Sequence, residues 1–159
     1  MKILLVRHCK AEAGGIDSER DLTPEGKKDA EIIAKFLSRL GCKPAKIVSS
    51  PLKRAILTAQ AISKSTNAEV VIDDSLAEAT VSTIVSVLQR HLPYEMIIVV
   101  GHQPSLGKFV SFACTAGSME FELKIPPGGI CTIETASIPL TSPAKLLWCV
   151  NPDLINVLI

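Results

Sequence analysis

Three side chains suited to catalysis follow the two most hydrophobic stretches of this sequence. Arg7 and His8 come directly after the apolar run Ile3–Val6, and His102 follows the apolar run Met96–Val100 after one intervening residue. Arginine offers phosphate or carboxylate a planar fork of donors, and histidine serves near neutral pH as a base, an acid or a nucleophile. One such residue could simply cap a strand at the surface. Two histidines and an arginine together predict a site.

The elements that must position these residues form an α/β pattern. The two apolar runs are typical of strands buried on both faces in a parallel sheet, and such sheets bind ligands at the carboxyl ends of their strands. Further strands are expected at 46–49, 69–72, 119–125, 130–136 and 145–150, and helices at 24–40, 50–62, 81–92 and 106–113. Connections near the end of the chain are too short for crossover helices, which favours antiparallel strands at one edge.

This pattern predicts a three-layer α/β/α fold. Helices are expected on both faces of a mostly parallel central sheet with antiparallel edge additions. The length of 159 residues fits a single domain spanning residues 1–159.

Arg54 breaks a local rule of helix composition. It lies in the first turn of the helix expected from residue 50, where a cation faces the positive end of the helix dipole. A bound anion would reverse that penalty, because helix N-termini and arginine forks both suit phosphate. We therefore interpret Arg54 as an anion ligand beside Arg7, and its neighbour Lys53 as facing solvent. The alternative for Arg54 is a surface side chain on a flexible stem.

Two other charged residues are weaker candidates. Arg20 belongs to a polar loop, residues 11–22, that starts directly after the first strand and can fold back toward the same crevice. Charge runs of this kind are usually solvated connections, which is the alternative. Glu78 precedes the helix at 81–92 and is either a general acid or a carboxylate that only stabilises the helix start; we favour the second.

Composition restricts the partners and the compartment. A net charge of +1 points to neither nucleic acid nor an anionic membrane. No apolar run approaches the length of a membrane span, and the N-terminus lacks the features of a signal peptide. Five scattered cysteines without metal spacing predict reduced thiols in a cytoplasmic protein. No acidic cluster has magnesium-ligand spacing, which is in keeping with a site that uses no metal and no cofactor.

Taken together, the motifs resemble the histidine phosphatase superfamily. The motifs follow the family's order over nearly the whole chain: Arg7-His8, Leu22-Thr23-Pro24-Glu25-Gly26, Ser49-Ser50-Pro51-Leu52-Lys53-Arg54-Ala55 with Thr58-Ala59, and Val100-Gly101-His102. The short length and the ending around Leu147-Trp148 and Pro152 look most like the SixA-type phosphohistidine phosphatase branch. The resemblance implies a phosphoglycerate-mutase-like fold.

The resemblance also implies a role for each candidate. His8 would be the nucleophile and become transiently phosphorylated. Arg7, Arg54 and His102 would bind the phosphoryl oxygens, and Arg20 would join them. Members of this branch hydrolyse phosphohistidine on protein partners without a metal, so the expected substrate is a phosphorylated protein of the histidine-containing phosphotransfer type. Phosphoryl transfer needs in-line positioning and positive charge, which these residues supply.

Two positions depart from the family pattern. Cys9 stands where the superfamily usually has glycine, and we interpret it as a tolerated small residue; a crowded pocket or a reactive thiolate are the alternatives. Glu78 only roughly matches the carboxylate that protonates an alkoxide leaving group in larger relatives. An imidazole leaving group needs a strong acid less. The alternative functions are a phosphatase of small phosphate esters and a phosphoprotein-binding module without turnover.

Overall fold

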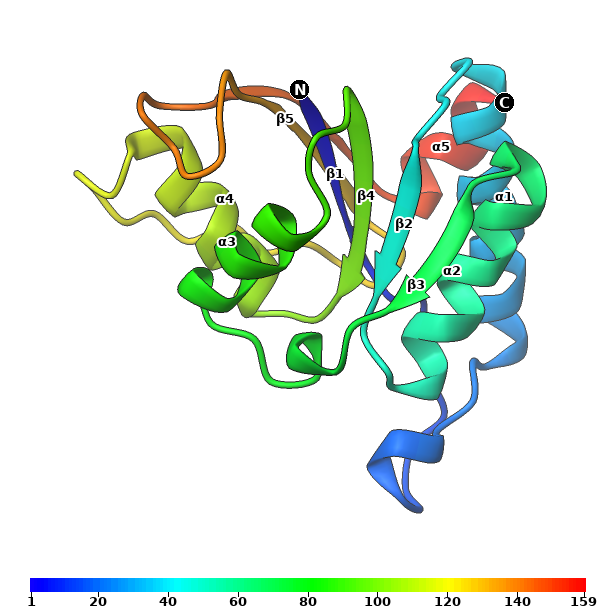
Figure 1. Cartoon of the computed structure of the whole chain (residues 1–159). Coiled ribbons are helices and arrows are strands. Elements are labelled where there is room, and N and C mark those ends of the chain that lie inside the picture. The colour runs from blue at the N-terminus through cyan, green and yellow to red at the C-terminus, as the bar shows by residue number, and fades with distance from the viewer.

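Six strands form one sheet, whose order brings the ends of β1 and β4 together (Figure 1). The computed structural model describes residues 1–159. Its strands are β1 (Lys2–Arg7), β2 (Lys46–Ser49), β3 (Glu69–Ile72), β4 (Met96–Gly101), β5 (Ile130–Glu134) and β6 (Lys145–Val150). They lie in the order β3-β2-β4-β1-β5-β6. The neighbours among β1 to β4 pair in parallel, whereas β5 pairs antiparallel with β1 and β6 with β5. The expected mostly parallel sheet with antiparallel edge strands is confirmed.

Helices cover both faces of this sheet. They are α1 (Pro24–Arg39), α2 (Lys53–Thr66), α3 (Val81–Arg90), α4 (Ser105–Thr115) and α5 (Pro152–Leu158), with short 3-10 segments η1 (Asp17–Glu19) and η2 (Asp74–Leu76). Figure 1 shows α1, α2 and α5 on one face and α3 and α4 on the other. The side chains of β1 alternate accordingly: Ile3 and Leu5 pack with α3 and α4, and Leu4 and Val6 pack with α1, α2 and α5. The three-layer architecture is confirmed.

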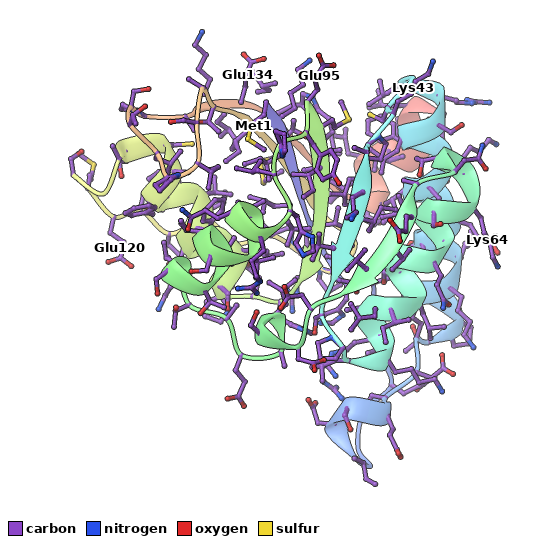
Figure 2. All side chains as sticks on the ribbon, viewed as in Figure 1. Met1, Lys43, Lys64, Glu95, Glu120 and Glu134 are labelled. Atoms are coloured by element: carbon purple, nitrogen blue, oxygen red, sulfur yellow. A yellow bond between two sulfur atoms is a disulfide. The ribbon has the colours of Figure 1, made fainter.

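The two ends of the central strands carry different residues. Figure 2 shows the side chains of Met1, Glu95 and Glu134 at the end of the sheet where β1 and β4 begin. Arg7 and Gly101, the last residues of these two strands, are paired in register at the opposite end. Ile3–Val6 between them is almost inaccessible to solvent, at 0–1% exposure. The hydrophobic strands therefore act as a rigid support for the residues that follow them.

The first helix begins against the chain that leaves β1. Thr23 caps α1 as the sequence predicts, because its Oγ1 accepts a hydrogen bond from the Gly26 amide at 2.9 Å. Gly26 lies so close to Lys10 that a Cβ at this position would be 2.1 Å from the Lys10 carbonyl oxygen. Only glycine allows α1 and the segment after His8 to approach this closely.

The prediction of a strand at 119–125 is wrong. This segment forms no ladder with any strand. Other groups satisfy parts of its backbone instead: Gln103 Nε2 donates to the Leu123 carbonyl at 2.9 Å, and Arg7 Nη1 donates to the Ile125 carbonyl at 3.0 Å. The helix α5 is not among the elements expected from the sequence; Asn151 caps it by accepting a hydrogen bond from the Leu154 amide.

Two of the five cysteines are joined, which corrects the expectation of reduced thiols. Cys131 and Cys149 pair in register across β5 and β6 and form a disulfide, with their Cα atoms 4.3 Å apart. Cys9, Cys42 and Cys114 are free. None of the helices combines the length and apolar character that a membrane span requires.

Candidate active site

Five of the six predicted site residues line one pocket at the ends of β1 and β4. The pairing of Arg7 with Gly101, and a hydrogen bond from the His8 amide to the Gly101 carbonyl at 3.1 Å, bring His8 and His102 together. Their ring centroids are 5.1 Å apart. The pocket has a volume of about 480 Å³ and is lined by Arg7, His8, Lys10, Ala11, Asp17, Arg20, Leu52, Arg54, Ala77, His102, Gln103 and Pro127.

The hydrogen bonds of His8 define which of its ring nitrogens carries the proton. Its Nδ1 lies 2.7 Å from the carbonyl oxygen of Cys9. Because a carbonyl can only accept, Nδ1 carries the proton of the neutral ring. The lone pair is then on Nε2, which accepts a hydrogen bond from Arg54 Nε at 3.3 Å. Burial, together with the charges of Arg54 and Arg7, lowers the pKa of His8 to about 4. His8 is therefore neutral at pH 7, with its lone pair on Nε2.

Arg7 has a donor without an acceptor. Its Nη1 is bonded to the Ile125 carbonyl, whereas its Nε is buried and makes no hydrogen bond within the protein. A buried donor left unpaired costs roughly 1–3 kcal/mol. A phosphoryl oxygen bound in the pocket is an acceptor that would remove this cost.

Arg54 is buried rather than a flexible surface side chain. It lies in the first turn of α2 with 6% exposure. Its Nη1 donates to the main-chain carbonyl of Asp17 at 2.7 Å, and its Nη2 donates to the carboxylate of the same residue at 3.2 Å. Neighbouring Lys53 is half-exposed and paired with Asp21 at 3.0 Å, outside the pocket as expected.

Arg20 does fold back toward the crevice. Asp17 holds it through Oδ1, at 3.0 Å from Arg20 Nε and 2.9 Å from Nη2. Arg20 Nη1 also donates to the Glu12 carbonyl at 3.2 Å. Asp17 thus contacts two guanidinium groups of the pocket. Sequence reasoning missed it because it belongs to a charged run that is usually solvated.

His102 is held by a serine that sequence reasoning also missed. Its Nε2 lies 2.7 Å from the hydroxyl of Ser50, a fully buried residue directly after β2. Burial, together with the nearby charge of Arg54, lowers the pKa of His102 to about 4. The signal available in the sequence was a polar Ser49-Ser50 pair at the end of an apolar strand.

Cys9 does not enter the pocket. Its side chain is fully buried among the residues that pack against α1, α2 and α5. Its amide donates to Thr58 Oγ1 at 3.0 Å, and burial raises the pKa of its thiol to about 12. The thiol is therefore protonated at neutral pH and faces the core. Neither a crowded pocket nor a reactive thiolate fits this placement.

The structure leaves Glu78 outside the pocket. Glu78 is exposed, and its neighbour Ala77 contributes to the lining in its place. Asp17 is the one acidic side chain that lines the pocket.

The pocket adjoins a second cavity. Arg7 and Gln103 line both the pocket and a neighbouring cavity of about 650 Å³, which is bordered by Lys108 and residues 120–124. A larger cavity of about 840 Å³ between α3 and α4 contains none of the predicted site residues.

Comparison with known proteins defines the family. Residues 3–86, more than half of the chain, match the histidine phosphatase superfamily (branch 1). The chain belongs to this superfamily, and its expected membership is confirmed.

Two curated relatives match in part of their length. The chain is 39% identical over 83 residues to phosphoserine phosphatase 1 of Hydrogenobacter thermophilus, covering 49% of the chain and 38% of the relative. It is 41% identical over 63 residues to the human mitochondrial serine/threonine-protein phosphatase PGAM5, covering 39% of the chain and 22% of the relative. The chain thus matches well under half the length of each relative.

Solved structures match over nearly the whole chain. The protein histidine phosphatase SixA complexed with tungstate has a TM-score of 0.84 at 20% identity, covering 98% of this chain and 99% of that one. A provisionally assigned phosphohistidine phosphatase SixA from Nakamurella multipartitia has a TM-score of 0.81 at 22% identity, covering 95% of each chain. The alpha-ribazole phosphatase of Shigella flexneri has a TM-score of 0.74 at 16% identity, covering 92% and 94%. These likenesses confirm the fold.

Proposed function

We propose that the protein is a phosphohistidine phosphatase that hydrolyses phosphohistidine on a protein partner. The Nε2 lone pair of His8 attacks phosphorus, the bond from phosphorus to the substrate imidazole breaks, and that imidazole leaves with a proton on its own ring. Water then attacks phospho-His8, which releases inorganic phosphate and restores neutral His8. Arg7, Arg54, Arg20 and His102 stabilise the charge on the phosphoryl oxygens in both steps.

The observation that carries this proposal is the absence of a carboxylic acid in the pocket. Asp17 is its one acidic lining residue, and the hydrogen bond from Arg54 lowers the pKa of Asp17. Asp17 is therefore ionised, and Glu78 lies exposed outside the lining. An alkoxide leaving group needs a proton from such an acid, whereas an imidazole does not. The pocket chemistry thus favours a phosphorus–nitrogen substrate over a phosphate ester.

The adjoining cavity supports a protein as the substrate. Arg7 and Gln103 line both the phosphoryl pocket and the 650 Å³ cavity beside residues 120–124. A polypeptide flanking the phosphorylated histidine can occupy this space, and a small ester would leave it empty. We therefore keep a protein of the histidine-containing phosphotransfer type as the proposed partner.

A phosphatase of small phosphate esters is the second candidate. It is favoured by the 39% identity over 83 residues to a protein named phosphoserine phosphatase 1. A binding module without turnover has no observation in its favour, because the Cys9 side chain that motivated it leaves the pocket.

Hydrolysis rates on two substrates separate these functions. We expect kcat/KM on a histidine-phosphorylated phosphotransfer protein to exceed that on phosphoserine by roughly 10²–10⁴-fold, the usual contribution of a general acid. EDTA should leave both rates unchanged, since we propose a metal-independent reaction. An equal or higher rate on phosphoserine would support the ester phosphatase. Tight binding of the phosphoprotein without phosphate release would support the binding module.

A cytoplasmic location remains our proposal from the sequence. The Cys131–Cys149 disulfide bears on it, because disulfides are rare in cytosolic proteins. Alkylation of free thiols in intact cells, before lysis, tests it. Modification of these two cysteines in the cytosolic fraction would agree with the proposal, and their protection in an oxidising compartment would contradict it.

A further inference from the structure

Asp17 connects two cations that come from different parts of the chain. Its Oδ1 binds Arg20, which lies in the loop at 11–22, at 2.9 and 3.0 Å. Its Oδ2 and its main-chain carbonyl bind Arg54 of α2 at 3.2 and 2.7 Å. All three residues line the pocket of His8.

The contacts of Arg54 are divided between two edges of its guanidinium group. The end that carries Nη1 and Nη2 faces Asp17, and Nε faces His8 Nε2 at 3.3 Å. A guanidinium is planar and rigid. When Asp17 holds Nη1 and Nη2 in place, the orientation of Nε is therefore fixed as well. Nε is the atom beside His8 Nε2, the proposed nucleophile. A phosphoryl group attacked by His8 would meet the edge that contains Nε.

We propose that Asp17 is a positioning residue that orients Arg54 and Arg20 toward the phosphoryl group. This inference rests on the proposed function for the reaction, although its effect on anion binding does not require turnover. Asp17 itself does not touch the reacting atoms. It acts through the two guanidinium groups, whose remaining N–H bonds are left for phosphoryl oxygens.

The loop that carries Asp17 is closed at its base. Ala11 and Leu22 form an isolated antiparallel bridge, and the Glu12 amide donates to the Asp21 carbonyl at 2.8 Å. This base places η1 against α2, where Asp17 meets Arg54. The Asp17 side chain is 66% exposed, whereas the Arg54 side chain that it binds is only 7% exposed. Asp17 therefore reaches the buried guanidinium of Arg54 from the solvent side of the pocket.

The same contacts permit an opposite role. A carboxylate on two arginines could compete with phosphate for them, and its removal would then strengthen anion binding. Positioning predicts that removal weakens binding. The sign of the change in affinity decides between the two roles.

Anion affinity of Asp17 variants is the test. Kd for inorganic phosphate and for orthovanadate would be measured by calorimetry in the parent, Asp17→Ala, Asp17→Asn and Glu19→Gln. Glu19 lies in the same 3-10 segment and outside the pocket lining, so its variant controls for the loss of one negative charge. We expect Asp17→Ala to weaken both anions by about tenfold, the low end for one hydrogen bond to a charged group. The Kd values of Asp17→Asn should lie between those of the parent and of Asp17→Ala. The Kd values of Glu19→Gln should equal those of the parent.

A double-mutant cycle with Arg20 distinguishes positioning from a merely structural role. In an Arg20→Ala background, Asp17→Ala should weaken anion binding less than it does in the parent, because one of the two partners of Asp17 is already absent. Tighter binding in Asp17→Ala, or an unchanged Kd in both backgrounds, would overturn the proposal. If Asp17→Ala failed to fold, the Asp17→Asn comparison would decide. A protein that binds phosphate as expected yet hydrolyses nothing would contradict the proposed function and leave the role of Asp17 standing.

Discussion

The histidines of the pocket owe their neutral state to burial among cations. Burial lowers the pKa of His8 and of His102 to about 4, from an ordinary 6.5. The unfolded chain therefore binds protons between pH 6.5 and 4 that the folded protein does not. Each histidine contributes stability that is fully present above pH 6.5 and is lost as the pH falls through 4. His8, the proposed nucleophile, accordingly stays unprotonated well into the acid range.

Ring titration by NMR checks this property. With ¹⁵N-labelled histidine, we expect the rings of His8 and His102 to titrate with midpoints near pH 4, and the free energy of unfolding to fall between pH 6.5 and 4. His8→Gln and His102→Gln variants assign the resonances. A midpoint near 6.5 for His8 would show that its ring is solvated and that the pocket geometry described above is wrong.

Cys9 should be dispensable for chemistry, because its thiol faces the core and His8 carries the lone pair. We expect Cys9→Gly to retain activity and Cys9→Ser to stay within about tenfold of the parent, roughly 1.4 kcal/mol in barrier. The serine hydroxyl enters a fully buried site in which Thr58 is the polar neighbour, so Cys9→Ser should also lose about 1 kcal/mol of unfolding free energy. Steady-state kinetics and urea unfolding measure the two effects. A loss of several orders of magnitude in both variants would make the thiol the nucleophile.

Some residues of the site could be found from the sequence and others could not. His8, Arg7 and His102 are visible because they end strongly apolar runs, and Arg54 because its charge opposes a helix dipole. Asp17 and Ser50 act through partners 37 and 52 positions away. No local pattern encodes such distant contacts, so both residues look like ordinary loop and strand-end polar groups.

At the scale of elements, the approach of α1 to the chain after β1 is a requirement of the site. A Cβ at Gly26 would lie 2.1 Å from the Lys10 carbonyl oxygen, a backbone atom that cannot move without the segment following His8. We expect Gly26→Ala to lose about 1–3 kcal/mol of unfolding free energy, as overpacked sites do. Activity should fall with it, because the backbone carbonyl that orients His8 belongs to the same segment.

The matched control for this prediction is Glu31→Ala, an exposed position on the same helix. Its unfolding free energy and kcat/KM should equal those of the parent, since alanine is a good helix former. A Gly26→Ala protein as stable and active as this control would show that α1 and the Lys10 segment are not in such close contact.

Helices and strands could be predicted where burial produces a regular apolar pattern in the sequence. They could not be predicted where hydrogen bonds to residues distant in the sequence determine the backbone conformation. The central strands are continuous apolar runs, and α1 has its cap and a stripe of buried residues, so each is visible locally. The segment 119–125 has residues that a strand accepts, yet side chains of Arg7 and Gln103 bind its carbonyls instead of a neighbouring strand. The helix α5 spans only seven residues, too few for a periodic pattern.

For the whole molecule, we propose that residues 1–159 unfold as one domain. One sheet runs between the two core clusters, so neither cluster keeps its packing surface without the other. The Cys131–Cys149 disulfide closes a loop with a sequence separation of 18. A disulfide that closes a loop of this length stabilises the folded state by about 3 kcal/mol, because it lowers the entropy of the unfolded chain.

Urea unfolding with and without a reductant tests both statements. We expect a single unfolding transition in each condition. The free energy of unfolding should be about 3 kcal/mol lower after reduction. A Cys131→Ser/Cys149→Ser protein is the control, and a reductant should not change its transition. Two separate transitions would contradict the single domain, and a parent protein insensitive to reduction would contradict a formed disulfide.

The central claim is that His8 Nε2 accepts the phosphoryl group, and trapping that intermediate tests it most directly. The protein would be mixed with a ³²P-phosphohistidine protein, quenched in base within one turnover and digested for peptide mapping. We predict label on the peptide that contains His8, stable in base, lost in acid, and absent from His8→Ala. Label that survives acid, or turnover that persists in His8→Ala, would contradict the account.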